Sequence, residues 1–214
     1  MKDQSSISGY KYSNANNSHA HAYLLPTLMH ELAAIQRRLG NTPRLFDLGC
    51  GNGSVGAQLA EHGWSVTGVD PSSEGIKQAR EAYPHLRFDE GSAYDQLATK
   101  YGQFSVVISL EVVEHVYAPR DYAKTLFNLV EPGGTAIVST PYHGYFKNLA
   151  LAVTGKMDRH FTALWDHGHI KFWSIPTLTA LLTEVGFQDI RFHRVGRVPA
   201  LAKSMIAVAE KPRS

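Results

Sequence analysis

Short apolar runs alternate with helix-like patterns along most of the 214-residue chain. Runs with the length and composition of buried strands lie at residues 44–48, 66–70, 86–88, 104–109, 135–140, 187–195 and 205–210. The fourth run is almost entirely apolar, as expected for a parallel strand that is buried on both faces of a sheet. Because the strands alternate with helices and no internal repeat is found, the pattern predicts an α/β fold with a doubly wound sheet.

Leucines at helical spacing predict a helix over residues 23–39, which ends at Gly40. Similar patterns predict further helices at about residues 54–62, 72–83, 119–130 and 174–185. Ser174 is a good N-cap for the last of these, and Gly186 is a good stop. The expected helices therefore fill most of the intervals between the expected strands.

The size and composition of the chain are those of one globular domain. It has 43% hydrophobic and 19% charged residues, and its net charge of +2 is too small to indicate nucleic-acid binding. The only cysteine, Cys50, excludes an internal disulfide and suits a reducing compartment. No apolar run approaches the roughly 20 residues of a membrane span, and the first residues lack the apolar region of a secretory signal. We therefore expect a cytoplasmic protein without a membrane span.

Residues 44–56 join the first strand to a helix through a glycine-rich turn. Gly49, Gly51 and Gly53 have no Cβ atom, so the backbone of the turn can adopt positive φ and approach a ligand closely. The helix that begins near Ser54 directs its positive end toward the same space. Asp70 ends the second strand, where a carboxylate can accept hydrogen bonds from both hydroxyls of a ribose. The arrangement predicts a nucleoside-binding site.

Two kinds of cofactor fit a turn of this type. Gly51, Gly53 and Gly56 match the pattern GxGxxG, which accommodates nicotinamide dinucleotides as well as S-adenosylmethionine (SAM). Asp47 stands before the first glycine of the turn, where its carboxylate would repel a pyrophosphate. The same carboxylate can bind the ammonium group of a methionine moiety, directly or through water. The sequence therefore favours SAM over a dinucleotide.

Residues 47–53 and 69–70 resemble the first two motifs of class I SAM-dependent methyltransferases. Residues 109–116, 132–134 and 138–140 are most similar to the O-methyltransferases of ubiquinone biosynthesis and their relatives. This resemblance spans residues 44–210. It implies a seven-stranded Rossmann-like sheet, mostly parallel, whose last strand is antiparallel and inserted beside the fifth. It also implies SAM as the cofactor and S-adenosylhomocysteine (SAH) as its product.

The resemblance assigns cofactor binding to ten positions of this chain: Asp47, Gly49, Cys50, Gly51, Gly53, Asp70, Pro71, Ser92, Ala93 and Leu110. Ser92 stands where many relatives carry an aspartate that binds adenine. We therefore expect Ser92 and the backbone amide of Ala93 to make that contact. Cys50 is expected to serve mainly as a small side chain within the turn, with a catalytic thiol as the alternative.

The whole chain, residues 1–214, is expected to form a single methyltransferase domain. Residues 1–43 would be an N-terminal lid and helix, and residues 44–140 the SAM-binding core. Residues 141–173 would be a substrate cap inserted after the fifth strand, and residues 174–214 the C-terminal helix and strands. The lid and the cap are implied by the resemblance.

The acceptor is expected beyond the carboxyl ends of the strands, where open α/β sheets bind their ligands. Glu111 and His115 follow the fourth strand, and His167 and His169 lie in the cap; these four residues are the candidates for base catalysis or positioning. No metal site is assigned; the resemblance gives Glu111, Glu114 and His115 as the ligands of a divalent cation if one is bound. The alternative is that Glu114 and His115 only brace the loop, without a metal.

Aromatic and histidine side chains suggest what the acceptor is. The expected substrate contacts are Tyr10, His21, Tyr142, His143 and Trp165. Walls rich in rings indicate an aromatic or otherwise planar small molecule, methylated at an oxygen. No nucleic acid is expected as a partner, and the protein is expected to be a monomer or a homodimer.

Three other functions remain open. A methyltransferase acting on RNA or protein is supported by a basic face around Lys147, Lys156, Arg159 and Lys171, although four such charges are more often solvated surface. The GxGxxG pattern allows an NAD(P)-dependent oxidoreductase. A SAM-binding partner subunit without catalytic activity is the third alternative.

Overall fold

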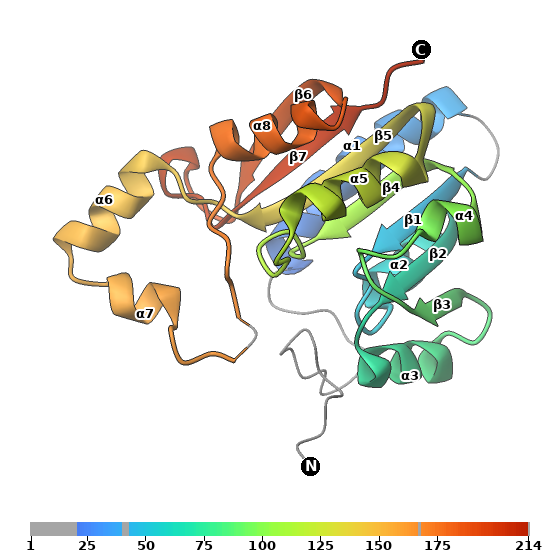
Figure 1. Cartoon of the computed structure of the whole chain (residues 1–214), viewed down its shortest axis with the longest axis horizontal. Coiled ribbons are helices and arrows are strands. Elements are labelled where there is room, and N and C mark those ends of the chain that lie inside the picture. The colour runs from blue at the N-terminus through green and yellow to red at the C-terminus, as the bar shows by residue number, and fades with distance from the viewer. Residues whose placement is uncertain (1–20, 40–42, 167, 214) are drawn as a thin grey trace.

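One mixed sheet forms the centre of the molecule. The structure is a computed structural model that describes residues 21–39, 43–166 and 168–213. In this part of the chain seven strands are arranged in the order β3-β2-β1-β4-β5-β7-β6 (Figure 1). They are β1 (Arg44–Leu48), β2 (Ser65–Asp70), β3 (Arg87–Glu90), β4 (Phe104–Leu110), β5 (Val130–Pro141), β6 (Gln188–Val195) and β7 (Ser204–Glu210).

The strand directions confirm the predicted fold class. β7 is antiparallel to both of its neighbours, β5 and β6, whereas the other paired strands are parallel. The connection from β6 to β7 is short, so these two strands can only pair as an antiparallel ribbon. β7 thereby lies beside β5, as expected for the last strand.

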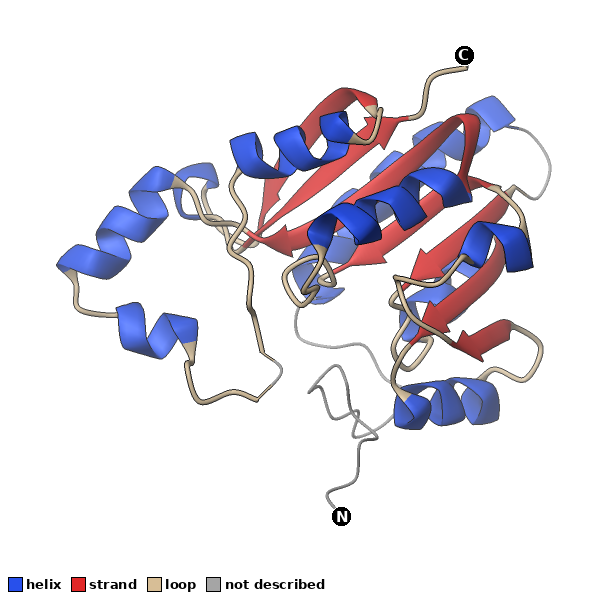
Figure 2. Cartoon of the chain, in the orientation of Figure 1, coloured by secondary structure: helices blue, strands red, loops and turns tan. Residues whose placement is uncertain are grey.

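Helices cover both faces of the sheet (Figure 2). They are α1 (His21–Leu39), α2 (Ser54–Glu61), α3 (Ser73–Ala82), α4 (Leu97–Tyr101), α5 (Pro119–Leu129), α6 (Tyr145–Val153), α7 (Met157–Phe161) and α8 (Ile175–Glu184), with a short 3-10 helix η1 (Pro199–Leu201) before β7. None of the helices in the described ranges combines the length and the apolar character needed to cross a membrane.

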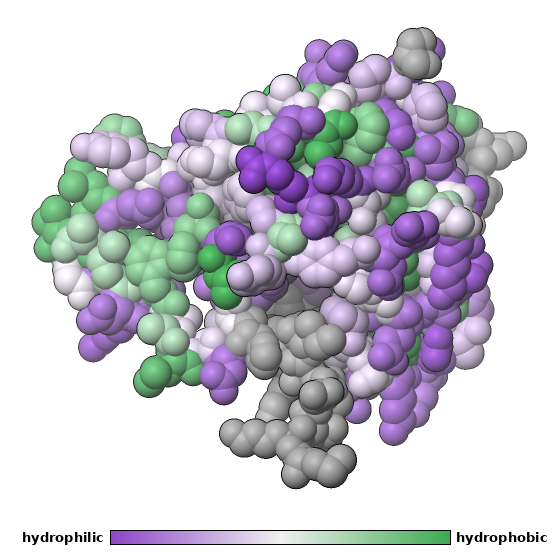
Figure 3. All heavy atoms as spheres, in the orientation of Figure 1, coloured by the Kyte–Doolittle hydropathy of each residue, from purple (hydrophilic) through white to green (hydrophobic). Residues whose placement is uncertain are grey.

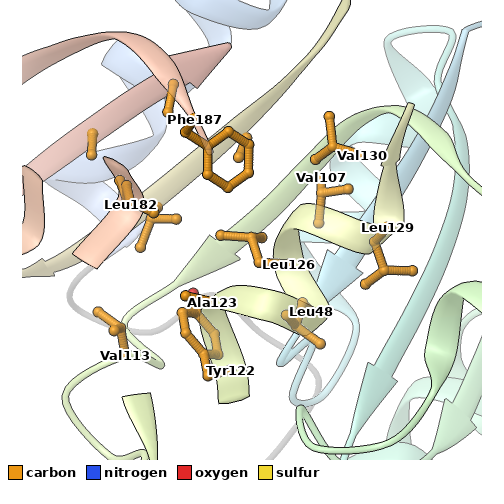
Figure 4. Packing of buried hydrophobic residues seen from close by; sticks show 14 of the residues in the cluster. Leu48, Val107, Val113, Tyr122, Ala123, Leu126, Leu129, Val130, Leu182 and Phe187 are labelled. Atoms are coloured by element: carbon orange, nitrogen blue, oxygen red, sulfur yellow. The ribbon is translucent and has the colours of Figure 1, made fainter. Parts of the chain in front are cut away.

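The larger hydrophobic core lies between the sheet and helices α5 and α8. Figure 4 shows Leu126 and Leu129 of α5 packed over β4, with Leu182 of α8 and Phe187 beside them. These side chains are almost completely buried. Burial of leucine and phenylalanine side chains is the main source of folding free energy, at about 1.5–3 kcal/mol each. This core therefore holds the sheet together at the strands that border the cap.

The central strand β4 explains why its sequence is apolar almost throughout. Val107 belongs to the core beneath α5, whereas Val106 and Ile108 belong to the core on the opposite face. Successive side chains of a strand point to opposite faces, so a strand with a helical layer on each side needs apolar residues at nearly every position. The prediction of a doubly covered parallel strand is confirmed.

Helix α1 belongs to the layer behind the sheet. Leu24, Leu28, Leu32 and Ile35 fill the second core, against strands that include β7. Glu31 on the same helix accepts hydrogen bonds from Arg191 and His193 of β6 and so ties the helix to the edge of the sheet. The helix predicted over residues 23–39 is confirmed as α1, and the N-terminal lid stays a prediction. Residues 1–20 lie outside the described residues.

Three helices were not expected from the sequence. Residues 97–101 form α4, which is too short for a periodic pattern to reveal. Residues 145–153 form α6 and residues 157–161 form α7, and together they make up most of the cap segment. Figure 1 shows this pair projecting to the left of the sheet. The sequence of α6 has no polar stripe facing outward, so the ordinary amphipathic pattern does not identify it.

Replacing Leu126 by alanine should lower the free energy of unfolding by about 2–5 kcal/mol, because the substitution leaves a cavity in the larger core. The matched variant Leu164→Ala should change it by less than about 0.5 kcal/mol, because the Leu164 residue is 98% exposed. Urea unfolding measures both values. Equal losses in the two variants would contradict the core described here.

Candidate active site

The glycine turn is held in place by hydrogen bonds to the end of β2 and by packing against the loop after β4. Gly49 and Cys50 donate their backbone amides to the carbonyl of Val69, at 2.8 and 3.1 Å, so the turn folds over the end of β2. Gly49 has φ of 91°, and a Cβ atom there would lie 2.3 Å from a methyl group of Val112. Gly49 is therefore required by the loop after β4 as well as by the turn conformation.

Gly53 and Gly68 are required by the same kind of close packing. Gly53 has φ of 75°, and a Cβ atom there would lie 2.9 Å from Phe88. A Cβ atom on Gly68 would lie 2.7 Å from the Cβ atom of Cys50. Cys50 thus fills the space above β2, and burial raises the pKa of its thiol, which suits the expected packing role.

Asp70 connects the glycine turn to the start of α3. Its carboxylate accepts a hydrogen bond from the amide of Gly51 at 2.9 Å and another from the amide of Ser72 at 2.8 Å. Each carboxylate oxygen can accept a second hydrogen bond, so ribose binding by Asp70 stays a prediction. Pro71 is the residue between the strand and the N-cap Ser72.

Asp47 provides a second carboxyl group beneath the turn. Its residue is 2% exposed, and burial together with the negative charge of Asp70 raises its pKa to about 7. Two neighbouring carboxyl groups disfavour a pyrophosphate and favour a ligand with a positive charge. The donor set therefore fits the ammonium group of an amino-acid moiety, which would lower the pKa of Asp47 on binding.

The loop after β3 is organised by Asp95, a residue that the sequence analysis did not single out. Asp95 accepts a hydrogen bond from the amide of Ser92 at 2.8 Å, and the hydroxyl of Ser92 accepts one from the amide of Tyr94 at 3.2 Å. The Tyr94 ring is exposed, and its hydroxyl accepts a hydrogen bond from the amide of Ala118. The adenine contact of Ser92 and Ala93 stays a prediction.

The side chain of Glu111 is held by the hydroxyl groups of two serines in the sheet. Leu110 ends β4, and Glu111 follows with the unusual φ of 55°. Its carboxylate accepts hydrogen bonds from the hydroxyls of Ser139, at 2.9 Å, and Ser204, at 3.4 Å. Burial raises the pKa of Glu111 to about 7. The side chain of Glu111 is thus engaged by the sheet, and its roles as a metal ligand or in catalysis stay predictions.

Glu114, His115 and His169 form a compact group instead. Their ligand atoms lie within 4.8 Å of one another, and Nε2 of His169 is 4.0 Å from Oε1 of Glu114. Glu114 is 1% exposed, and within the described residues no hydrogen bond of ordinary geometry reaches its carboxylate oxygens, although the nearby Thr140 hydroxyl lowers its pKa. Burial and the charge of Glu111 raise the pKa of Glu114, whereas burial and neighbouring His115 lower the pKa of His169 to about 4.

Backbone hydrogen bonds place the returning cap segment on the loop after β4. The carbonyl of Glu114 accepts from the amides of Ile170 and Lys171, at 2.9 and 3.0 Å. The indole of Trp173 donates to the carbonyl of Val113 at 3.1 Å. These bonds bring His169 next to His115, with ring centroids 4.9 Å apart. Two expected candidates from distant segments are therefore neighbours, and His167 lies outside the described residues.

The expected substrate contacts separate into two groups. Trp165 packs edge-on against His115, with centroids 5.8 Å apart, and so borders the compact group. His143 lies deeper in the cap, stacked on Phe161, and burial lowers its pKa to about 4. Tyr142 lies against Gly144 and packs on the larger core, so it is placed to support the cap.

The two N-terminal candidates are less informative. His21 is the first residue of α1, and burial lowers its pKa. Tyr10 lies outside the described residues. Contact of either residue with a substrate stays a prediction.

Sequence reasoning missed a network behind Glu111. Lys147 was assigned to a basic face, but its residue is only 9% exposed and its ammonium donates to the carbonyl of Lys203 at 3.3 Å. The hydroxyl of Tyr23 bonds to Ser204, which donates to Glu111. Lys147 is the only charged residue in the α6 sequence, and this was the signal that the sequence offered.

Comparison with known proteins supports the fold and gives a family. Residues 17–191 match the family described as "Methyltransferase domain". Curated relatives named ubiquinone biosynthesis O-methyltransferase include one from Caulobacter sp. (strain K31), 40% identical over 124 residues, which are 54% of this chain and 49% of the relative. Another, from Thiobacillus denitrificans, is 29% identical over 171 residues, with coverage of 75% and 73%. The chain spans about half the length of the Caulobacter relatives it matches.

A solved structure, magnesium protoporphyrin IX methyltransferase (ChlM) from Synechocystis PCC 6803 with bound SAH, shares the fold. Its TM-score is 0.67 at 19% identity, with 87% of this chain and 81% of that chain covered. The predicted Rossmann-like methyltransferase fold is thus confirmed.

Asp47→Asn should change stability in a pH-dependent way. The folded-state pKa of Asp47, about 7, lies above its ordinary value of 3.8, so the folded protein binds more protons between these pH values. The contribution of this group to stability is therefore lost as the pH rises through that window. At pH 8 the variant should be more stable than the natural protein, by up to about 4 kcal/mol, and near pH 4 the difference should be small.

Urea unfolding at both pH values measures this effect. Asp121→Asn, an exposed change on α5, is the matched control and should show no comparable pH dependence. A variant destabilised equally at both pH values would contradict the electrostatic account of Asp47.

Proposed function

Because the chain belongs to the methyltransferase domain family, we propose that it transfers a methyl group from SAM to an oxygen of a small aromatic or otherwise planar acceptor, releasing SAH. The observation that carries this proposal is the pair of buried carboxyl groups, Asp47 and Asp70, beneath the glycine turn. The names of the curated relatives support transfer to oxygen.

The cofactor would lie across the ends of β1 and β2. Asp47 would bind its ammonium group, Asp70 its ribose, and the amides around Ser92 and Ala93 its adenine. Leu110, at the end of β4, would pack against it. When bound, SAM supplies a methyl group that its sulfonium already activates, so the protein must mainly position the acceptor and exclude water.

The compact group of Glu114, His115 and His169 is the proposed acceptor site. Its imidazoles lie at the carboxyl end of β4, next to the cap, where ligands of open sheets bind. A proton taken from an acceptor hydroxyl by His169 would lie 4.0 Å from Glu114, whose ionised form would stabilise the imidazolium. Trp165 would border the ring of the acceptor, and His143 would shape the cap behind it.

The same three residues also fit a divalent cation. Within the described residues no hydrogen bond of ordinary geometry reaches the buried carboxylate oxygens of Glu114, and a cation would satisfy them. One carboxylate with two imidazoles suits Zn²⁺ or Mn²⁺ better than Mg²⁺. We propose His169 as the third ligand in place of Glu111, whose side chain is bonded to Ser139. When bound, the cation would favour the ionised form of an acceptor hydroxyl.

The alternatives are less well supported. The family match contradicts an NAD(P)-dependent oxidoreductase. The basic face that favoured RNA loses Lys147 to the interior, so we propose a small-molecule substrate and no nucleic-acid partner. A catalytically inactive partner subunit is disfavoured by the compact acid–histidine group. We further propose that the protein acts in the cytoplasm, as a monomer or a homodimer, consistent with its single cysteine.

Titration calorimetry with SAH tests the cofactor assignment. The protein should bind SAH at a single site and show no saturable binding of NAD⁺ or NADP⁺. Asp47→Asn should weaken SAH binding at least about tenfold, because a buried charge-assisted hydrogen bond contributes roughly 1.5–3 kcal/mol. Asp121→Asn should bind as the natural protein does. Absence of SAH binding by the natural protein would overturn the proposed function.

Turnover of a catechol, measured by mass spectrometry of the methylated product, tests the acceptor site. His169→Ala and Glu114→Gln should each lower kcat about 10²–10⁴-fold with SAH binding unchanged, since one group handles the proton and the other stabilises its charge. His85→Ala, an exposed change before β3, is the matched control. Full turnover in both site variants would exclude this site.

Prolonged chelation separates the two proposed roles of the compact group. Loss of activity that Zn²⁺ or Mn²⁺ restores, together with loss of calorimetric metal binding in His169→Ala, would establish the cation. Undiminished activity after chelation would leave proton transfer as the role of these residues and dismiss the metal.

A further inference from the structure

Helix α6 holds its one charged side chain inside the cap. Its exposed residues include Tyr145, Phe146 and Val153, and Figure 3 shows hydrophobic surface gathered over α6 and α7 at the left of the molecule. Lys147, by contrast, is the buried residue of this helix. A helix on the surface of a protein ordinarily places charged residues toward water and apolar residues toward the interior. The reversed polarity of α6 therefore indicates that a positive charge is needed inside the cap.

The ammonium group of Lys147 is only partly satisfied in this position. Within the described residues it donates one hydrogen bond, to the carbonyl of Lys203 at 3.3 Å, although an ammonium group has three donors. Glu111 is the acidic group that acts on Lys147, but no ion pair joins the two in the described part of the chain. The carboxylate of Glu111 is held by Ser139 and Ser204 instead. Because a buried charge without close partners is unfavourable, a bound anion would stabilise Lys147.

Three further basic groups lie within electrostatic range of Lys147. Burial and the charge of Arg197, which lies between β6 and β7, lower the pKa of Lys147 to about 8. Burial and the charge of Lys147 in turn lower the pKa of His143 to about 4, and they also lower the pKa of His160 on α7. The interior of the cap is therefore electropositive. A cleft that is lined by one sign of charge attracts ligands of the opposite sign.

His143 and Asn148 add polar atoms to the same interior. Nδ1 of His143 and Oδ1 of Asn148 are buried, and in the described residues no hydrogen bond of ordinary geometry reaches either atom. The Asn148 side chain partly offsets the lowering of the His143 pKa, so the two side chains are neighbours. A neutral imidazole has one N–H donor, and a carboxamide has two. Both side chains can therefore donate hydrogen bonds to an oxyanion beside Lys147.

Aromatic rings enclose this polar group. His143 is stacked on Phe161 with ring centroids 5.8 Å apart, and the ring of His160 lies 5.3 Å from that of His143. Phe172 meets His143 and Phe161 edge-on, at centroid distances of 5.0 and 4.7 Å. Flat rings of this kind favour a planar ligand. A planar molecule that carries an anionic group would satisfy both the rings and the ammonium group.

We propose that the interior of the cap around Lys147 is a subsite for a carboxylate carried by the acceptor, so that the acceptor is a hydroxylated aromatic acid. One buried cation among neutral donors matches the single charge of a carboxylate better than the two charges of a phosphate. The subsite lies within electrostatic range of the compact group, because Lys147 contributes, after burial and two histidines, to the lowered pKa of His169. The hydroxyl of the acceptor would face His169 while its carboxylate faces Lys147. That the occupant is the acceptor rests on the proposed function.

Calorimetry with the SAH-saturated protein and two matched ligands tests the subsite. 3,4-Dihydroxybenzoate and 3,4-dihydroxybenzamide share the ring and both hydroxyls, and they differ in the charge of the third substituent. The natural protein should bind the benzoate at least about tenfold more tightly, because hydrogen bonds between charged partners are stronger than those to neutral ones. Equal binding of the two ligands, or binding of neither, would overturn the proposal.

Variants identify the side chain that recognises the charge. Lys147→Met removes the ammonium group from a long side chain and should bind the two ligands about equally, whereas Lys147→Arg should still prefer the benzoate. Lys156→Met, an exposed change next to α7, is the matched control and should keep the full preference. A preference for the benzoate that persists in Lys147→Met would assign the carboxylate to another part of the protein and so contradict the subsite.

Turnover and cofactor binding separate the subsite from the proposed function. The ratio of kcat/KM for the benzoate to that for the benzamide should fall at least about tenfold in Lys147→Met. SAH binding by the natural protein and by each variant reports the cofactor site independently. A protein that binds SAH and shows no preference for the charged ligand would refute the subsite alone. Failure of the natural protein to bind SAH would refute the proposed function as well.

Discussion

The loop from Val112 to Glu114 joins the two halves of the candidate site. On one side Val112 occupies the space that a Cβ atom on Gly49 would need, which locks the loop against the glycine turn. On the other side the carbonyls of Val113 and Glu114 accept hydrogen bonds from Trp173 and from the returning cap segment. Any shift of this loop therefore moves the proposed cofactor site and the proposed acceptor site together.

Three buried carboxyl groups lie in or next to the two halves of the candidate site. Asp47, Glu111 and Glu114 all have raised pKa values, because burial removes each from water. The negative charge of Asp70 adds to the effect at Asp47, and that of Glu111 adds to it at Glu114. Such burial is unfavourable for folding, and it is characteristic of sites shaped by ligand binding and catalysis. The three groups serve different ends: Asp47 faces the turn, Glu111 is bonded to the sheet, and Glu114 is directed toward two histidines.

The burial of Lys147 also determines which side of α6 faces outward. Lys147 is drawn inward toward the carbonyl of Lys203 and the charge of Glu111, and the apolar side of α6 is thereby turned outward. The buried ammonium group of Lys147 thus links the acidic interior near β4 and β7 to the apolar surface of helices α6 and α7. His169 of the compact group and the apolar surface of α6 and α7 thus belong to the same insertion.

Local sequence patterns were sufficient for the sheet and for the glycine turn. The apolar runs, the helical spacing of residues such as Leu24 and Leu28, and the turn from Gly49 to Gly53 depend on neighbours within a few residues, so they can be read directly. The motif resemblance added the position of the antiparallel strand. Of the compact acid–histidine group, only Glu114 and His115 could be expected to lie together, because they are adjacent in sequence.

The remaining features were decided by contacts between distant segments. His169 joins Glu114 because the amides of Ile170 and Lys171 bond across 56 residues of chain or more, a pairing without any local signature. The hydrogen bonds of Glu111 come from Ser139 and Ser204, on two other strands, and these too have no local signature. By itself the sequence determined the sheet, the glycine turn and the class of cofactor that this turn favours. Only the tertiary structure decided which buried side chains face one another, because burial and hydrogen bonding between distant residues depend on the packed chain.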